Sequence, residues 1–274
     1  MSEDAFRNPA AARPDEPLLP PDPQPCPPGW VTGPPEFVGV GAQRCGTTWW
    51  HRQIAVHPGV AFQQGLHHKE VHFFDALADV ESLGPEDAER YARYFARPPE
   101  GAVTGEWTPR YMYDGWPLAQ ITQIAPHARI LVMLRDPVDR YASGHARENR
   151  LARERGEAGI SSAMVEEQRV RGLYAGQVER VLQTFPREGV LILQYERCRI
   201  EYDTELERTY AFLGLDTAFR PVGRRNAPGE PRERDLAAAE RERLARGYAA
   251  DVARLAQIAP EVDPALWPSV RGLL

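Results

Sequence analysis

Short apolar runs alternate with helical patterns along most of the chain. Phe37-Val38-Gly39-Val40 is a β-type run that ends in a glycine turn, and a helical pattern extends from Thr47 to His57, where Pro58 stops it. Arg129–Leu134 (RILVML) and Val190–Gln194 (VLILQ) are continuous apolar runs, as expected of strands covered on both faces. These segments predict buried strands separated by helices.

The remaining segments extend this alternation. Ala102–Thr104 is a further possible strand, and a helix is expected from Pro137, because proline suits the first helical turn. An amphipathic stretch surrounds residues 165–185, and the chain after Tyr195 has a mainly helical pattern with a loop near 221–230. This order predicts an α/β fold, in which a parallel β-sheet is flanked by helices on both faces.

The first 35 residues differ from the rest in composition. They contain the proline-rich segment PDEPLLPPDPQPCPPG, which cannot hold a regular helix or a central strand. We therefore expect residues 1–35 to form an N-terminal arm and residues 36–274 to form one domain. A chain of 274 residues is long enough to bury a sizeable core.

Charge and cysteine content narrow the classes of partner and compartment. A net charge of −6 gives no overall attraction for nucleic acid or anionic membranes, so any anion site must be built locally. Cys26, Cys45 and Cys198 are widely spaced, which favours a reducing compartment. The acidic N-terminus and the lack of a long apolar run predict a cytoplasmic protein without a membrane span.

The segment Gly41-Ala42-Gln43-Arg44-Cys45-Gly46-Thr47-Thr48 has the glycine spacing of a phosphate-binding Walker A loop. A strand precedes it and a helix follows, so backbone amides and the helix N-terminus can surround an anion. Thr47 stands where a Walker loop has lysine, and Arg44 is the nearest cation. The motif makes the fold P-loop-type, although the same residues can also form a plain strand-to-helix turn.

A second anion motif follows the apolar run at 129–134. It reads Arg135-Asp136-Pro137-Val138-Asp139-Arg140, and Ser143 follows three residues later. An arginine at the end of a strand, beside the start of a helix, suits bidentate binding of a phosphate. Taken alone, the segment is better explained as a capped helix with surface charges.

Together the two motifs resemble those of the PAPS-dependent sulfotransferases, where PAPS is 3′-phosphoadenosine 5′-phosphosulfate. The resemblance implies that Arg135 and Ser143 hold the 3′-phosphate. It also implies that the loop from Gln43 to Thr48 holds the 5′-phosphosulfate, a donor site made of Gln43, Arg44, Cys45, Gly46, Thr47 and Thr48. A basic loop at Arg224 and Arg225 would close over the nucleotide. PAP (adenosine 3′,5′-bisphosphate) would be the product, and no metal is expected.

Two further segments resemble the heparan sulfate branch of this family. Lys69-Glu70-Val71-His72-Phe73-Phe74-Asp75 looks like its K-E-x-H-F-F-D segment, and Gly105-Glu106-Trp107-Thr108-Pro109 looks like its E-K-[TS]-P segment. The resemblance implies that Glu70 is the general base and that His72 and Asp75 orient it or bind the acceptor. His68 and His72 are the alternative bases.

The departures from that branch also matter. Arg44 stands where the branch has a lysine, and we expect it to stabilise the leaving group. Trp107 replaces a second lysine and is a candidate for stacking on a sugar or aromatic acceptor. The spacing of His67, His68 and His72 is weak evidence for a metal site.

The sequence thus predicts transfer of a sulfuryl group from PAPS to a hydroxyl, or less readily an amine. The acceptor would be a sugar, a lipid or a secondary metabolite, and no nucleic-acid partner is expected. The alternatives are a P-loop kinase or other nucleotide phosphotransferase, and a non-catalytic nucleotide-binding protein. Dependence on magnesium discriminates between the two enzymes, because a kinase requires the ion.

Overall fold

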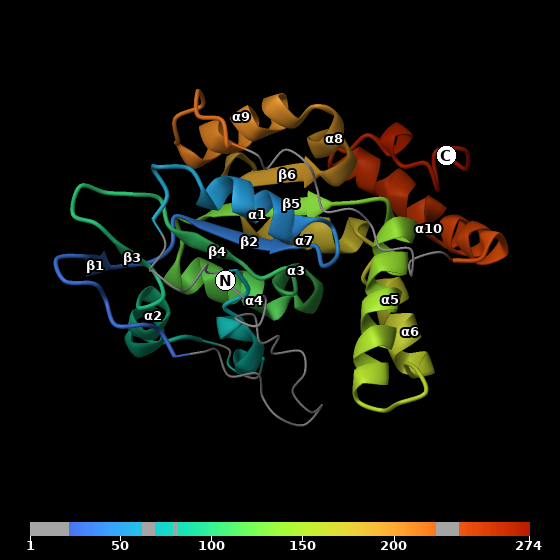
Figure 1. Ribbon diagram of the computed structural model, residues 1–274, viewed down its shortest axis with the longest axis horizontal. Helices are drawn as coiled ribbons and strands as arrows, with labels where there is room; N and C mark the ends of the chain where they lie inside the picture. Colours follow the sequence, from blue (N-terminus) through green and yellow to red (C-terminus); the bar gives the residue numbers. More distant parts are fainter. Residues whose placement is uncertain (1–21, 62–68, 79, 81, 223–235) are drawn as a thin grey trace.

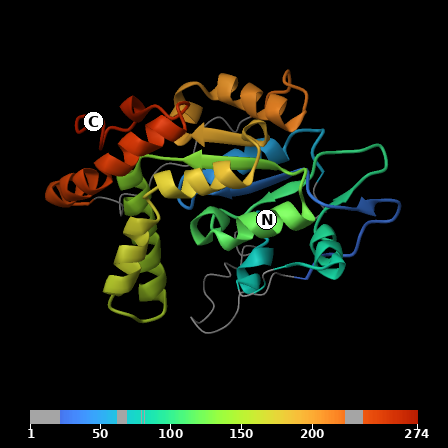
Figure 2. The ribbon, with the colours of Figure 1, turned by 180° about the vertical axis from the view of Figure 1, so that it is seen from behind.

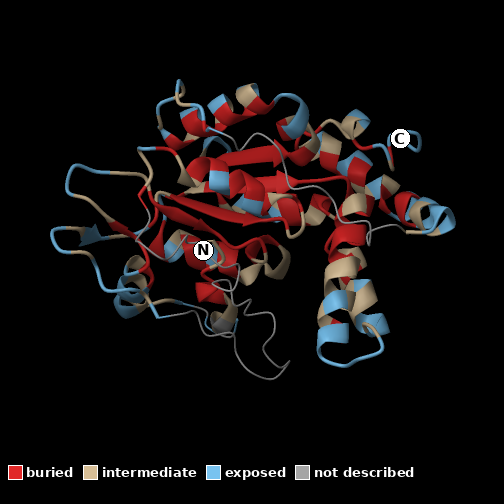
Figure 3. Cartoon of the chain, in the orientation of Figure 1, coloured by how far each residue is buried: buried red, intermediate tan, exposed pale blue. Residues whose placement is uncertain are grey.

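A four-stranded parallel sheet forms the centre of the molecule. The computed structural model describes residues 22–61, 69–78, 80, 82–222 and 236–274. The strand order is β4-β2-β5-β6, with β4 at Gly105–Trp107, β2 at Phe37–Gly41, β5 at Arg129–Leu134 and β6 at Val190–Gln194. The sheet is almost entirely buried (Figure 3). Its continuous apolar strands therefore have the environment that their sequences predict.

Helices cover both faces of this sheet, which confirms the predicted fold class. α1 (Thr47–Ala55) lies over the face seen in Figure 1. α4 (Trp116–Ile124) and α7 (Ala175–Thr184) lie over the opposite face, which Figure 2 shows. The shorter elements are α2 (Pro85–Ala92), α3 (Tyr111–Asp114), η3 (Phe73–Leu77), η4 (Arg187–Gly189) and η6 (Pro264–Leu266).

Aromatic side chains join α1 to the two helices that follow β6, α8 (Tyr195–Ile200) and α9 (Tyr202–Leu213). The Trp49 and Tyr195 rings pack edge to face at 5.8 Å, and the Trp50 and Tyr202 rings do so at 5.9 Å. Such contacts stabilise the fold beyond the area they bury. They also fix α1, and with it the loop after β2, against the end of β6.

α5 (Pro137–Glu154) begins at the predicted proline and projects away from the sheet beside α6 (Ser162–Val170), as Figure 1 shows. α10 (Ala238–Ile258) packs against α7. Asp251 of α10 accepts hydrogen bonds from the backbone N–H groups of Tyr174 at 2.7 Å and Ala175 at 3.2 Å. A carboxylate thus satisfies the amides at the N-terminus of α7.

Part of the predicted N-terminal arm is ordered against the domain. β1 (Val31–Thr32) pairs with β3 (Ala96–Arg97) in a small antiparallel sheet. Residues 1–21 lie outside the described residues, and the boundary at residue 36 stays a prediction.

Two sequence expectations differ from the structure. The strand expected at Ala102–Thr104 lies instead at Gly105–Trp107, and Val103 forms an isolated bridge with Val60. The amphipathic stretch at 165–185 is two helices, α6 and α7, separated by a turn at 171–174. By contrast, β5 and β6 have the predicted bounds.

Within the described ranges, no helix combines the length and the apolar character needed to cross a membrane.

Candidate active site

The Gly41–Thr48 loop connects β2 to α1 and depends on a glycine at its end. Gly46 has φ 89° and is the N-cap of α1, where no side chain caps the helix. A Cβ placed on Gly46 would lie 2.4 Å from the Tyr195 ring. Both the left-handed backbone and the packed ring therefore require glycine. The first amides of α1 are left for another acceptor, as at any helix N-terminus.

Arg44 connects this loop to the second predicted anion motif. Its Nε donates a hydrogen bond of 3.0 Å to Ser143 Oγ, although the two residues are 99 positions apart. Arg44 is half-buried and has φ 67°. The loop after β2 and the helix after β5 thus belong to one site, because β2 and β5 are parallel neighbours.

Arg135 lies at the end of β5, and its position is fixed by an aromatic ring. Its guanidinium carbon is 4.8 Å from the centre of the Tyr195 ring, and only 5% of the residue is exposed. Asp136 caps α5 by accepting hydrogen bonds from the amides of Val138 at 2.9 Å and Asp139 at 3.3 Å. Because Tyr195 also packs on Gly46, one ring positions both predicted phosphate contacts.

The other predicted donor-binding residues differ in exposure. Gln43 is half-buried, Thr47 is buried and Thr48 is exposed. Cys45 is fully buried, and its Sγ lies 3.4 Å from the Tyr174 hydroxyl. Burial raises the pKa of the Cys45 thiol to about 11, so the thiol is neutral and faces the core. The Cys45 side chain thus packs the loop against Tyr174, and the expectation that this position binds the donor stays a prediction.

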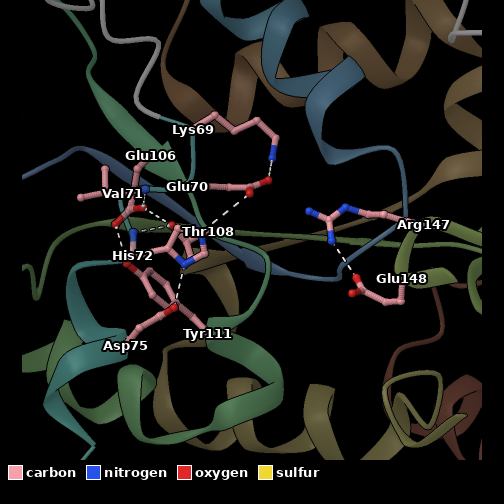
Figure 4. Close-up of polar contacts among 10 residues, drawn as sticks. All are labelled: Lys69, Glu70, Val71, His72, Asp75, Glu106, Thr108, Tyr111, Arg147 and Glu148. Carbon is pink, nitrogen blue, oxygen red and sulfur yellow. Dashed lines mark hydrogen bonds and ion pairs between the residues drawn. The ribbon is translucent and has the colours of Figure 1, made fainter. Parts of the chain in front are cut away.

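Lys69, Glu70, His72 and Asp75 form one charged cluster (Figure 4). The Lys69 ammonium contacts Glu70 Oε1, and His72 lies between two carboxylates. Its Nδ1 is 2.7 Å from Asp75 Oδ2 and its Nε2 is 3.7 Å from Glu70 Oε2. The Glu70 side chain is 37% exposed, whereas those of Lys69, His72 and Asp75 are 6%, 8% and 4% exposed. Glu70 is therefore the member of the cluster that a second substrate can reach.

The electrostatics distinguish the two candidate bases. Burial acts against the charge on His72, but hydrogen bonds to Asp75 and Glu70 outweigh it and raise its pKa to about 9. Burial also acts against the charge on Glu70 and would by itself raise its pKa. The Lys69 ammonium and His72 outweigh burial and hold that pKa well below its usual range. At neutral pH, His72 is thus protonated and cannot accept a proton, whereas Glu70 is ionised and can. His68 lies outside the described residues.

β4 holds the segment that carries these groups. The amide of Glu70 donates to the Trp107 carbonyl at 3.0 Å, and the amide of His72 donates to Thr108 Oγ1 at 3.3 Å. Glu70 and His72 have φ 68° and 57°. With Arg44, they are the non-glycine residues of positive φ in the described part of the chain. Each such conformation costs on the order of 1–3 kcal/mol, and strain of this kind clusters at functional sites.

Glu106 supports the same segment from beneath. Its carboxylate is fully buried and accepts hydrogen bonds from four donors: Tyr91 Oη at 2.6 Å, Tyr111 Oη at 3.2 Å, Thr108 Oγ1 at 2.5 Å and the amide of Val71 at 3.2 Å. Burial raises the pKa of Glu106, and the hydrogen bonds oppose that shift. Sequence reasoning gave Glu106 no role, because its burial depends on residues distant along the chain.

The structure corrects the expectation for Trp107. Its side chain is fully buried, so it cannot stack on an acceptor in this conformation. The indole occupies the space beside Gly39, where a Cβ would lie 2.1 Å from the ring. Its Nε1 donates a hydrogen bond of 3.1 Å to the Gly41 carbonyl. Trp107 therefore packs beneath the Gly41–Thr48 loop.

Lys69 is the second residue that sequence reasoning left without a role. It is the only lysine among the 33 lysine and arginine residues of the chain. The sequence could have pointed to Lys69, because arginine is used at every other lysine or arginine position of the chain.

The described residues contain no cluster of three His, Cys, Asp or Glu side chains arranged to hold a metal ion. His67, His68, Arg224 and Arg225 lie outside the described residues.

The loop after β2 and Arg135 after β5 lie at the carboxyl ends of neighbouring parallel strands, where ligands bind in sheets of this kind. A family model for the sulfotransferase domain matches residues 34–226. The chain belongs to this family.

Individual relatives agree with this assignment. The chain is 29% identical over 197 residues to mouse heparan sulfate glucosamine 3-O-sulfotransferase 3A1, which covers 66% of this chain and 46% of that protein. It is 27% identical over 191 residues to human heparan sulfate glucosamine 3-O-sulfotransferase 3B1, with the same coverage. The chain thus spans just under half the length of these relatives.

A solved sulfotransferase from Alicyclobacillus acidocaldarius has the same fold, with a TM-score of 0.66 and 27% identity. The match covers 85% of this chain and 98% of that one.

Proposed function

We propose that this sulfotransferase takes its sulfuryl group from PAPS, bound between the Gly41–Thr48 loop and the start of α5. The family implies this donor, and the local chemistry fits it. The backbone amides at Gly46 and the guanidinium of Arg44 suit the 5′-phosphosulfate. Arg135 and Ser143 suit the 3′-phosphate. The contact between Arg44 and Ser143 supports one continuous site for a ligand with two anionic ends.

The observation that carries the mechanism is the position of Glu70. It is a partly exposed carboxylate whose ion-pair partner, Lys69, lies within electrostatic range of Arg44. Glu70 would take the proton from the acceptor hydroxyl while the acceptor oxygen forms its bond to sulfur. The bond from sulfur to the bridging oxygen of PAPS would break, and its electron pair would leave on PAP. Arg44 would offset the negative charge on that oxygen.

We propose that the acceptor is a hydroxyl group of a saccharide. The names of the mammalian relatives support this class of acceptor. Arg147 of α5, which forms an ion pair of 2.6 Å with Glu148, points toward the Lys69–Glu70 pair in Figure 4. An arginine that points toward the base suits a hydroxylated ligand better than a lipid chain.

Transfer of radiolabelled sulfate from PAPS to a panel of acceptors, with EDTA present, tests this function. The panel contains glucosamine-based oligosaccharides, simple glycosides, a glycolipid and a phenol. We expect labelled saccharide and release of PAP without added magnesium. Labelling of the phenol or glycolipid alone would overturn the saccharide proposal.

A parallel assay with radiolabelled ATP and magnesium tests the kinase alternative. The structure gives that alternative little support, because Thr47 occupies the position of the Walker lysine. Phosphate transfer without sulfate transfer would overturn the proposed donor.

A further inference from the structure

Lys69 combines three properties that an ordinary surface lysine lacks. It is the only lysine in the chain, its side chain is 6% exposed, and its ammonium contacts the carboxylate of Glu70. Lysine is rarely buried to this degree. Its ammonium is a compact charge with three donors on a flexible stem, so it can change partners more readily than the planar fork of an arginine.

Two arginines lie close enough to Lys69 to act on its charge, one in the Gly41–Thr48 loop and one in α1. Glu70 lies on one side of the ammonium, while Arg44 and Arg52 are close enough to repel its charge. Burial, followed by these two cations, lowers the pKa of Lys69 against the opposing effect of Glu70. An anion arriving at Arg44 would relieve this repulsion and compete with Glu70 for the ammonium.

The same ion pair restrains the candidate base. Glu70 is held by Lys69 on one oxygen and approached by His72 on the other, and its pKa lies well below its usual range. A carboxylate stabilised by two cations is a weak proton acceptor. Loss of one of these partners would raise its basicity.

We propose that Lys69 exchanges partners when the donor binds: its ammonium moves away from Glu70 and contacts a sulfonate oxygen of PAPS. This inference rests on the proposed function and specifies how its base is switched on. The exchange itself breaks no covalent bond and moves no proton. It confines effective deprotonation of the acceptor to the donor-loaded enzyme, and it places a second cation beside Arg44 at the group being transferred.

A single-residue signal tests the exchange. Protein grown with isotope-labelled lysine gives one lysine side-chain resonance, that of Lys69. We would record it without ligand, with PAP, with PAPS and with adenosine 5′-phosphosulfate, all in EDTA. PAP lacks the sulfonate and should leave the resonance near its ligand-free position, whereas both sulfonate-bearing nucleotides should shift it. The same resonance with saturating PAP and PAPS would overturn the proposal.

Calorimetry on the same samples separates failure of this inference from failure of the proposed function. If PAP and PAPS both bind but the Lys69 resonance does not distinguish them, the exchange is wrong and the donor site stands. If neither nucleotide binds, the proposed function is wrong, and the exchange is wrong with it.

Variants give an independent readout. Lys69→Met should weaken PAPS binding about tenfold while changing PAP binding by less than about twofold, because one charge-assisted contact is lost. Lys69→Arg should recover part of the lost PAPS affinity. Arg254→Met, at an exposed ion pair of α10, should leave the binding of both nucleotides unchanged. Glu70→Gln should shift the ligand-free Lys69 resonance. An unchanged resonance in that variant, or equal losses of PAP and PAPS binding in Lys69→Met, would overturn the exchange.

Discussion

Arg44 Nε donates a hydrogen bond of 3.0 Å to Ser143 Oγ, which joins the loop after β2 to the helix after β5. Neither residue would reach the other if these strands were not parallel neighbours with their carboxyl ends at one edge of the sheet. The contact brings the two predicted halves of the donor site together.

Arg135→Ala should weaken binding of PAP by about 10- to 100-fold and should change binding of adenosine 5′-phosphosulfate far less. The reason is that only PAP offers a 3′-phosphate to the guanidinium. Calorimetry with both nucleotides measures the difference, and Arg150→Ala, at an exposed ion pair of α5, is the control. Equal losses for the two nucleotides would show that the 3′-phosphate is held elsewhere.

Glu70→Gln should lower sulfate transfer by about 10²–10⁴-fold while PAP binding stays within about twofold of wild type. The amide cannot accept the proton, and a general base acts only in the chemical step. Radiolabel transfer and calorimetry measure the two quantities. Glu154→Gln, an exposed carboxylate of α5, should leave both unchanged. Near-normal transfer by Glu70→Gln would remove Glu70 from the mechanism.

Gly46→Ala should destabilise the protein and abolish PAP binding. The residue has φ 89°, which costs about 1–2 kcal/mol with a Cβ, and the new methyl group would collide with the Tyr195 ring. Gly176→Ala in α7 is the matched control, because a Cβ there meets nothing within 4 Å. That change should stabilise the helix by about 0.5–1 kcal/mol. Thermal unfolding of the two variants measures these changes in stability, and equal melting temperatures would contradict the account.

His72 should make stability depend on pH above neutrality. Its pKa is about 9 in the folded protein, compared with 6.5 for the ordinary imidazole. A raised pKa means that the stabilisation is complete below pH 6.5 and is lost as pH rises through 9. Its charge faces Glu70, Asp75 and Glu106. The difference in unfolding free energy between wild type and His72→Gln should therefore shrink over this range, by at most about 3 kcal/mol.

An NMR titration of the His72 ring measures the same pKa directly. A midpoint near 6.5 would contradict the assignment of His72 as a buried imidazolium.

Glu106→Gln should reduce turnover and thermal stability without weakening PAP binding. The substitution replaces a carboxylate oxygen by an NH₂ group facing hydrogen-bond donors, at a cost of roughly 1–3 kcal/mol. The segment from Glu70 to His72 then loses the part of its support that comes from the Glu106 carboxylate. Steady-state kinetics and calorimetry check this, with exposed Glu188→Gln as the control. A fall in PAP affinity equal to the fall in kcat would contradict the positioning role.

The sequence predicted best the elements whose residues have a single possible environment. β5 and β6 are runs of apolar side chains buried on both faces, and α5 begins at a proline after a capping aspartate. β4 was displaced in the prediction because its residues, Gly105, Glu106 and Trp107, do not form an apolar run. Their burial comes from Phe37 and Gly39 across the sheet and from the tyrosines around Glu106.

The sequence predicted the position of those site residues that belong to local motifs. Gly46 lies at the start of α1 and Arg135 directly after β5, as their motifs require, whereas the direction of a side chain was beyond prediction. Trp107 points into the core and Cys45 packs against Tyr174. Lys69 received no role, and only tertiary structure shows that its side chain is buried.

The proposed donor site binds a nucleotide with a 3′-phosphate and a 5′-phosphosulfate. Thermal unfolding with PAP, ADP or ATP, each with magnesium or EDTA, tests it most directly. A ligand at about one hundred times its Kd adds about 2.7 kcal/mol, which raises the melting temperature by a few degrees. We expect PAP to raise it equally with magnesium and with EDTA, and more than ADP or ATP at the same concentration. An increase only with ATP and magnesium would contradict the account and favour a phosphotransferase.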